Sequence, residues 1–142
     1  MFSANPRKPT EAYARVGLET GVAGADAHKL IMMLFDGAVL SLGLATQAMK
    51  DKKIAEKGRA ISDAIAIIST GLQASLDTTA GGDLALRLNA LYDYMCERLL
   101  FANLRNDQAA ISEVIRLLDE LRGAWAEIAK DVPAISGNKG TA

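Results

Sequence analysis

Few side chains in this sequence of 142 residues have the types and spacing that metal binding or catalysis requires. His28 is the only histidine and Cys96 the only cysteine, so the chain cannot supply the ligands of a zinc site or the Cys-x-x-Cys-His motif of a haem attachment. The Glu-x-x-His pair of di-iron bundles is also excluded, because Ala25 stands three residues before His28. We therefore expect no metal and no cofactor.

The motifs of nucleotide binding and acyl transfer are absent as well. No lysine follows Gly81-Gly82, which predicts a turn rather than a phosphate-binding loop, and no Gly-x-Ser-x-Gly elbow occurs. Asp36 and Asp93 have no evident acid–base partner, which favours surface hydrogen bonding. One alternative stays open, because His28-Lys29 is faintly similar to the site of a histidine phosphotransfer domain. That histidine needs a solvent-facing place in mid-helix, whereas His28 is predicted in the first turn of a helix, next to an apolar stretch. We therefore expect a protein that is not an enzyme.

Composition narrows the class of protein further. Sixteen Lys and Arg residues against seventeen Asp and Glu residues leave a net charge of -1. A chain with this charge has no overall electrostatic attraction to nucleic acid or to an anionic membrane. The single cysteine and the lack of an apolar signal segment at the N-terminus favour the cytoplasm. The stretch from Thr10 to Val132 contains no proline, and half of all residues are hydrophobic, which favours helix.

Four segments show the alternating steps of three and four residues that mark one face of a helix. Their apolar stripes run from Ile31 to Met49, Ile54 to Ser75, Leu84 to Ala102 and Ile111 to Ile128. Short connections force neighbouring helices to be antiparallel, so the sequence predicts an all-α, up-down four-helix bundle. We expect a flexible N-terminal arm over residues 1–24, the bundle over 25–130 and a disordered tail over 131–142.

The helix ends carry signals of their own. Asp26 and Asp83 are expected to cap the first and third helices. Asn106-Asp107 predicts a left-handed stop followed by the cap of the fourth helix. The break at 51–53 is marked by neither glycine nor proline.

The first helix has more apolar surface than one bundle core can use. Opposite its core stripe lies a second one, formed by Met33, Gly37, Leu40, Leu44 and Ala48. A helix that is apolar all round must be covered by lipid or by protein. Lipid is disfavoured, because the apolar run is shorter than the ~20 residues that span a bilayer and Asp36 would cost about 2.5–3.5 kcal/mol at its centre.

The third helix shows a similar surplus. Leu86, Leu100, Phe101 and Leu104 project away from its core stripe, with Tyr94 to one side. Each buried Leu or Phe is worth about 1.5–3 kcal/mol, so these residues favour a covered surface. Periodicity alone leaves open whether a partner chain covers them or whether they meet inside the bundle or at a homodimer seam.

Two further predictions concern the arm and the core. Tyr13, Val16, Leu18 and Val22 are spaced apolar residues in a polar segment, which suits a removable lid over the apolar surface; a leader without such a role is the alternative. Core positions are predicted for a separate set: Phe35, Leu42, Met95 and Trp125.

Three stretches together resemble the flagellar secretion chaperone family (FliS). They are His28–Ala38, Leu91–Met95 running on to Ala102–Asp107, and Leu117–Trp125, in the order and spacing of that family. The likeness covers about residues 11–130. This chain departs from the family at the start of the first helix, where Asp26-Ala27 replaces the usual Ser-Pro.

The resemblance implies a non-enzymatic, cytoplasmic export chaperone. Members of the family bind the C-terminal segment of flagellin as helical pieces around the bundle, prevent premature polymerisation and deliver the subunit to the flagellar type III export gate. Other flagellar regulators are possible further partners, and we expect a monomer or a weak homodimer. A self-associating structural bundle is the competing interpretation. Candidate client contacts, from helical-wheel arithmetic, are Tyr13, Val16, Met33, Leu40, Leu44, Leu86, Tyr94, Phe101 and Leu104.

Overall fold

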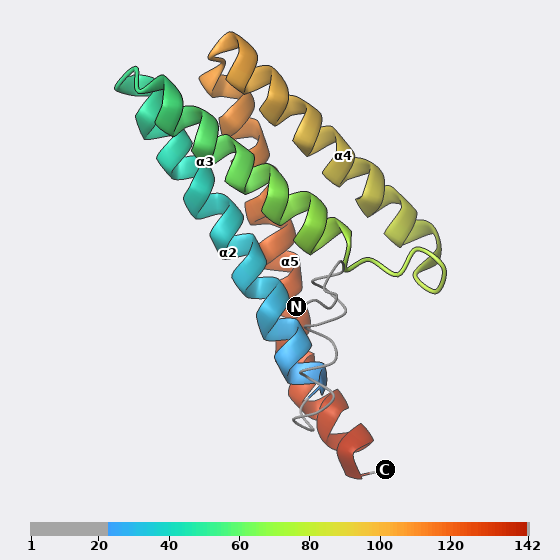
Figure 1. The fold of residues 1–142 in the computed structure, drawn as a ribbon. Helices are drawn as coiled ribbons and strands as arrows, with labels where there is room; N and C mark the ends of the chain where they lie inside the picture. Colours follow the sequence, from blue (N-terminus) through green and yellow to red (C-terminus); the bar gives the residue numbers. More distant parts are fainter. Residues whose placement is uncertain (1–22, 142) are drawn as a thin grey trace, which may run out of the picture.

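The computed structural model describes residues 23–141 and gives side-chain surroundings for residues 26–128. The elements are α2 (Ala23–Lys50), α3 (Ile54–Ala66), a π-helical continuation of α3 called η1 (Ile67–Gln73), α4 (Gly82–Arg105) and α5 (Gln108–Thr141), shown in Figure 1. No strand occurs in this described part of the chain. The predicted all-α four-helix bundle is confirmed.

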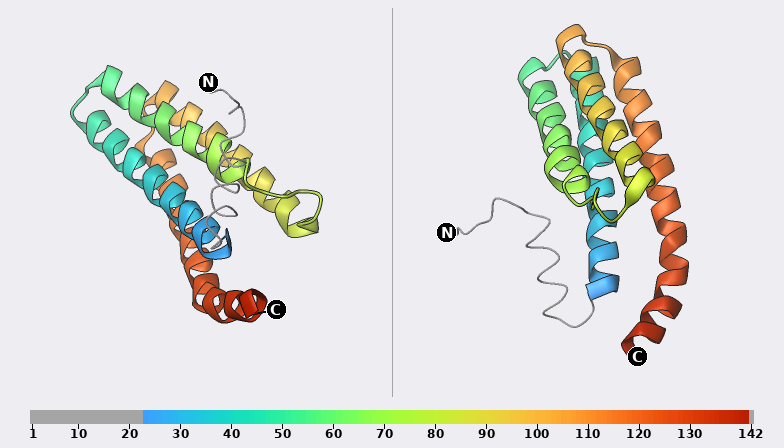
Figure 2. Two further views of the ribbon diagram at one scale, coloured as in Figure 1. Left: turned by 60° about the horizontal axis from the view of Figure 1, so that its bottom comes forward. Right: turned by 90° about the vertical axis from the view of Figure 1, so that its right-hand side faces the viewer.

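The helices form a ring in chain order. α2 packs against α3 and α5, while α4 packs against α5, η1 and α3. Within the described residues, no Cα atom of α2 comes within 8 Å of one in α4, so these two helices lie across the diagonal of the bundle. α2 and α5 also extend beyond the connection between η1 and α4 at one end of the molecule (Figure 2).

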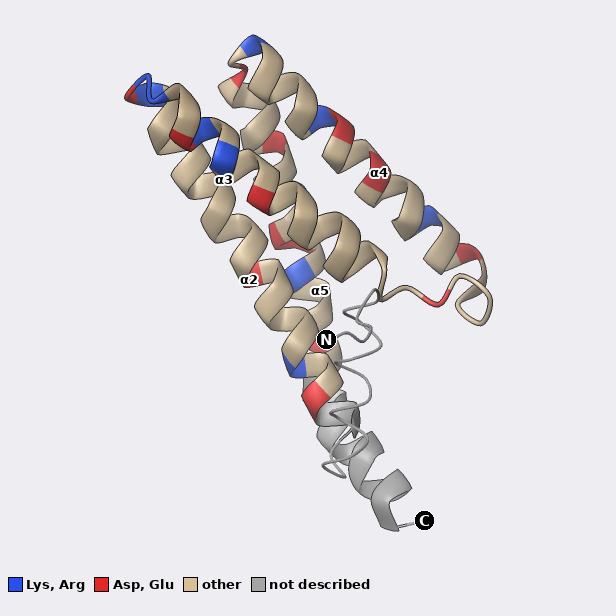
Figure 3. Ribbon diagram, viewed as in Figure 1, with Lys and Arg blue, Asp and Glu red and all other residues tan. Residues whose placement is uncertain are grey.

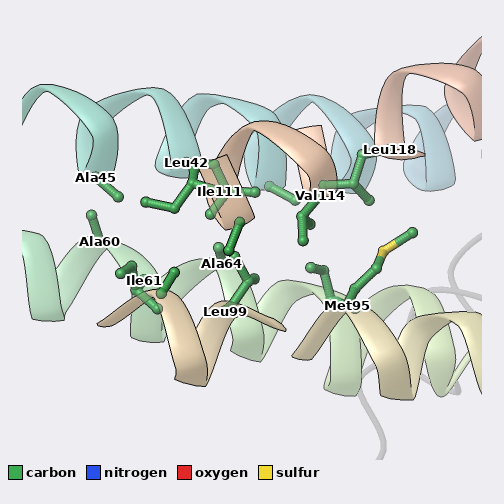
Figure 4. Close-up of a cluster of buried hydrophobic side chains, with 14 of the residues drawn as sticks. Leu42, Ala45, Ala60, Ile61, Ala64, Met95, Leu99, Ile111, Val114 and Leu118 are labelled. Atoms are coloured by element: carbon green, nitrogen blue, oxygen red, sulfur yellow. The ribbon is translucent and has the colours of Figure 1, made fainter. Parts of the chain in front are cut away.

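Most of the large core side chains come from the predicted apolar stripes. Phe35, Leu42 and Met95 are buried as predicted, and Trp125 is partly buried against the edge of the core. Figure 4 shows the centre, where small residues let the helices approach and larger ones fill the space between them. The fully buried large side chains are Leu42, Ile61, Ile68, Leu72, Met95, Leu99, Ile111, Val114 and Leu118.

The α4–α5 connection has the predicted chemistry. Asn106 adopts the left-handed conformation, with φ 54° and ψ 44°, and ends α4. The Asp107 carboxylate then accepts a hydrogen bond from the backbone N–H of Ala110 at 3.2 Å, as a helix cap does. At the 51–53 break, Lys52 takes the same left-handed conformation, with φ 59°, which explains how a turn forms there without glycine.

Two predicted caps are wrong. α2 begins at Ala23, so Asp26 lies inside its first turn, where a negative charge still favours the positive end of the helix dipole. α4 begins at Gly82, with Gly81 in the capping position and Asp83 in the first turn. The tight turn before α4 requires this glycine, because a Cβ atom on Gly81 would lie 2.6 Å from the backbone oxygen of Asp77.

The ends of the predicted apolar stripes lie outside the core. Ile54, Leu84 and Ile128, which stand at stripe ends, are exposed. Ser75 is exposed beyond the end of η1. Ala48 is only 6% exposed, so its place in the outer stripe of the first helix is wrong.

α5 continues into the segment for which a tail was predicted. The helix continues to Thr141, through residues 131–141 for which a tail without structure was predicted. The division into arm, bundle and tail stays a prediction, and residues 1–22 lie outside the described part of the chain.

Candidate functional site

The candidate contact residues on the helices all lie on the surface. Their exposed fractions run from 40% for Tyr94 to 77% for Leu104. We call Met33, Leu40 and Leu44 the α2 stripe. We call Leu86, Tyr94, Leu100, Phe101 and Leu104 the α4 stripe. Tyr13 and Val16 lie outside the described residues.

The α2 stripe is an uncharged surface. Between Lys29 and Lys50 the only charged residue is Asp36, so the ribbon of α2 in Figure 3 is almost entirely tan over this stretch. Met33 and Leu44 are eleven positions apart, which places them about 16 Å apart along the helix axis. Gly37 beside this stripe faces η1, because a Cβ atom there would lie 3.5 Å from the Ile67 side chain. The stripe therefore lies on the outer side of α2, next to the α3–η1 rod.

The α4 stripe is mixed with acidic side chains. Asp93 and Glu97 are exposed and both lie between Leu86 and Leu100 along α4. The Asp93 carboxylate accepts a hydrogen bond from Gln73 Nε2 at 2.7 Å, which joins α4 to the end of η1. Asp93 thus has the surface hydrogen-bonding role predicted for it, and this stripe has a negative rim that the α2 stripe lacks.

The two aromatic residues of the α4 stripe are held by one carboxylate on α5. The Tyr94 hydroxyl donates to Glu113 Oε2 at 2.5 Å, and Arg98 Nε donates to Glu113 Oε1 at 2.9 Å. The guanidinium of Arg98 also lies over the ring of Phe101, 5.2 Å from its centre. One acidic side chain therefore fixes the edge of α4 against α5.

These hydrogen bonds change how the groups titrate. The hydrogen bond from Tyr94 lowers the pKa of the Glu113 carboxyl, and Arg98 adds to that effect. The same bond raises the pKa of the Tyr94 hydroxyl, because it stabilises the protonated phenol. The cluster is therefore intact at neutral pH, with Glu113 ionised and Tyr94 protonated.

The two stripes do not form one continuous surface. They lie on α2 and α4, which are diagonal to one another, so α3 or α5 separates them on either side. A surface hollow of about 440 Å³ lies elsewhere, on α5, and is lined by Ser112, Ile115, Arg116, Asp119 and Glu120.

His28 has a structural role that the sequence did not indicate. Its ring stacks on Trp125 with the ring centres 4.6 Å apart, and its Nε2 lies 2.7 Å from the backbone oxygen of Trp125. The indole Nε1–H in turn donates to the backbone oxygen of His28 at 3.0 Å. His28 is only 8% exposed, so it lacks the solvent-facing position that a histidine phosphotransfer site needs. This geometry removes the support for that alternative.

A second α2–α5 contact lies on the surface. Arg122 Nε donates to Asp36 Oδ1 at 2.5 Å, and the carboxylate raises the pKa of the guanidinium. Asp36 is thus held in an ion pair at the surface, as its lack of an acid–base partner in the sequence indicated.

Sequence reasoning missed three polar residues that organise the helices: Glu113, Arg98 and Lys57. Lys57 is only 5% exposed, and its ammonium group donates to the backbone oxygen of Asn103 at 3.0 Å and to the Asn106 side chain. It therefore satisfies carbonyl groups at the end of α4. The only signal in the sequence was its position between Ile54 and Ile61 on the inner face of α3.

The remaining buried ionisable groups do not form a reactive site. Burial raises the pKa of Tyr92 to about 12 and also raises that of the Cys96 thiol, to which nearby Asp93 contributes. A raised pKa makes a thiol less reactive. In the part of the chain that the structure describes, no three His, Cys, Asp or Glu side chains are grouped to hold a metal ion.

One described helix, α2 between Asp26 and Lys50, is long and apolar enough to cross a membrane by length and composition. Helices of a bundle core pass the same test, and the inner face of α2 contributes Phe35, Leu42 and Ala45 to the core. Its outer apolar face is the part that this packing leaves uncovered.

Comparison with known proteins places the chain in a family. The profile of the family described as flagellar protein FliS matches residues 9–132. The flagellar secretion chaperone FliS of Salmonella typhimurium is 49% identical over 128 residues, which cover 90% of this chain and 93% of that protein. FliS of Escherichia coli is 45% identical, covering 89% and 91%, and FliSB of Pseudomonas aeruginosa is 42% identical, covering 83% and 93%. The chain, a four-helix bundle with two exposed apolar stripes, therefore belongs to the FliS family of flagellar secretion chaperones.

Proposed function

We propose that this chain is a cytoplasmic export chaperone that binds the C-terminal segment of flagellin, prevents its premature polymerisation and delivers it to the flagellar type III export apparatus. Membership of the FliS family supports the coarser role of a flagellar export chaperone, which is not a catalytic one. The observation that carries the finer proposal is the exposure of all the described candidate residues on α2 and α4.

The stripes favour a helical client. Residues of the α2 stripe recur at intervals of seven and four, the spacing at which an amphipathic helix can lie along another helix. Each leucine covered by a partner contributes about 1.5–3 kcal/mol, so the six Leu and Met residues of the two stripes can offset the cost of ordering a disordered segment.

The separation of the stripes constrains how the client binds. Because α2 and α4 lie across the diagonal, one straight helix cannot cover both stripes. The client therefore needs at least two amphipathic pieces joined by a linker that passes around α3 or α5. The piece over α2 meets an uncharged surface, whereas the piece over α4 is expected to carry basic residues facing Asp93 and Glu97.

The direct test is copurification of the chain with flagellin and with flagellin that lacks its C-terminal segment. We expect a complex with the full-length client only. A complex that forms equally well with the truncated client would contradict the proposal.

A role for the N-terminal arm is part of the same proposal. Tyr13 and Val16 would cover part of the exposed apolar surface when no client is bound and leave it when a longer helix competes. Deletion of residues 1–20 is expected to raise client affinity or to promote self-association. If neither property changes, the arm has no lid function.

Exposure of the stripes also suits a self-associating bundle, in which a second copy covers them. Light scattering of the isolated chain separates the two functions, because we expect a monomer or a weak homodimer. A stable dimer that fails to bind flagellin would favour the structural role. The export gate and other flagellar regulators are proposed as further partners of the loaded chaperone.

A further inference from the structure

The edge where α4 meets α5 differs from the rest of the apolar surface, because its aromatic side chains are held in place. Tyr94 and Phe101 are seven residues apart on α4 and therefore lie on one face, two turns from each other. Both rings remain about 40% exposed. The leucines of the same stripe have no comparable hydrogen-bonded support, since their side chains contain no polar atom.

Glu113 supplies that support from the neighbouring helix. Its two carboxylate oxygens bind different α4 side chains, the hydroxyl of Tyr94 at 2.5 Å and Nε of Arg98 at 2.9 Å. Arg98 in turn lies over the ring of Phe101. The side chains of Arg98 and Glu113 are only 29% and 27% exposed, so the ion pair is partly shielded from water. One carboxylate thus orients two rings, one directly and one through an arginine.

We propose that Tyr94, Arg98 and Phe101 form a preorganised subsite for the last turn of a client helix, and that Glu113 is its positioning residue. The proposal deepens the client-binding function proposed above and rests on it. An apolar side chain of the client lies on the two rings, and the free carbonyl groups at the end of the client helix accept hydrogen bonds from Arg98.

The charges on this edge favour a helix end over an acidic side chain. The terminal nitrogens of Arg98 make no hydrogen bond or ion pair within the described residues, because its contact with Glu113 uses Nε. Glu113 already offsets the charge of the guanidinium, so the terminal N–H groups of Arg98 can donate hydrogen bonds without an unbalanced positive charge at this edge. The last carbonyl groups of a helix have no partner inside it and carry a partial negative charge, which suits a paired guanidinium.

Preorganisation strengthens binding because the side chains are already ordered before the client arrives. Ordering a side chain on binding has an entropic cost. Without Glu113, the side chains of Tyr94 and Arg98 would be ordered only when the client binds, and binding would include that cost. Removing the anchor is therefore expected to weaken client binding without changing the fold.

The test compares client affinity for three variants with the wild-type chain. Tyr94→Phe keeps the ring and removes the hydroxyl, Glu113→Gln removes the charge, and Arg98→Lys keeps the charge but loses the planar fork. We expect the dissociation constant for the flagellin C-terminal segment to rise about threefold to tenfold in each case. The matched control is Glu120→Gln, the same change two turns along α5, where Glu120 pairs with Arg116; we expect less than about a twofold effect.

A spectroscopic measurement separates positioning from a general structural effect. In Glu113→Gln the pKa of the Tyr94 phenol, followed by NMR of labelled tyrosine, should fall toward its usual value near 10. Wild-type affinity in Glu113→Gln and Tyr94→Phe would overturn the subsite. Wild-type affinity in Arg98→Lys alone would overturn the helix-end contact.

The outcomes also distinguish this inference from the function on which it rests. If the wild-type chain binds the client and Leu40→Asp on α2 weakens binding, the proposed function holds whatever the α4 variants do. If the wild-type chain does not bind, both proposals fall. Should Glu113→Gln lower the melting temperature markedly, Tyr94→Phe and Arg98→Lys decide the result.

Discussion

The contact between His28 and Trp125 should control how firmly the projecting end of the bundle is held together. It joins the first turns of α2 to α5 through two hydrogen bonds and a ring stack, close to where these two helices extend beyond the η1–α4 connection. Trp125→Phe keeps a six-membered ring for stacking and removes the indole N–H donor together with the five-membered part of the ring. Trp125→Ala removes the donor, the stack and the buried part of the ring.

The expected magnitudes follow from these contacts. One net hydrogen bond contributes about 1 kcal/mol, the stack about 0.5–1.5 kcal/mol, and the half-buried indole about 1.5 kcal/mol. Trp125→Phe is therefore expected to lower the free energy of unfolding by about 1 kcal/mol, and Trp125→Ala by about 3–4 kcal/mol. For a chain of this size the corresponding decreases in melting temperature are about 4 °C and 12–16 °C.

Thermal unfolding followed by circular dichroism at the helix band measures both variants, with urea unfolding as the equilibrium check. The wild-type chain adds a local probe, because Trp125 is its only tryptophan and its fluorescence reports this contact alone. The reasoning would be refuted if Trp125→Ala melted within about 2 °C of the wild-type chain, or if both variants lost the same stability.

Three further predictions concern stability, each measured as the free energy of urea unfolding. Lys57→Met should lower the free energy of unfolding by about 2–4 kcal/mol, because it leaves the end of α4 without its buried donor. The control Arg59→Met, on the exposed side of α3, should change it by less than about 0.5 kcal/mol. Equal effects of the two variants would mean that Lys57 does not cap α4. Gly43→Ala should stabilise the chain by about 0.5–1 kcal/mol, since the new methyl group meets nothing within 4 Å in an exposed helix interior, and a loss of stability would contradict this. Gly71→Leu should cost about 1–3 kcal/mol, because even a Cβ atom there lies 3.0 Å from the side chain of Leu34; an unchanged value would show that η1 shifts freely.

The parts of the fold that follow from apolar periodicity could be predicted from the sequence. Leu42, Met95 and Leu118 lie in stripes that one helix face must bury, and the structure buries them. The same arithmetic identified Leu40 and Leu104 as surplus, because a side chain opposite the core stripe cannot reach the core. Their exposure is confirmed, while their contact with a client remains a proposal.

What the sequence could not predict are contacts between polar residues far apart in the chain. Glu113 meets Tyr94 and Arg98 only because α4 and α5 pack at a particular rotation, which periodicity does not specify. His28 reaches Trp125 across 97 positions for the same reason. The predicted cap at Asp26 failed because α2 already includes the three residues before it, and sequence signals fix helix ends less closely than helix interiors.

The most direct test of the central claim is calorimetric titration of the flagellin C-terminal segment into Leu40→Asp, with Ser62→Asp as the matched control. Leu40 lies in the α2 stripe, whereas Ser62 is exposed on α3, outside both stripes. We expect Leu40→Asp to keep its helical content and bind at least about tenfold more weakly, because it places a charge in an apolar contact, and Ser62→Asp to bind like the wild-type chain. Equal affinity of the two variants would contradict the claim that the exposed apolar stripe on α2 binds the client.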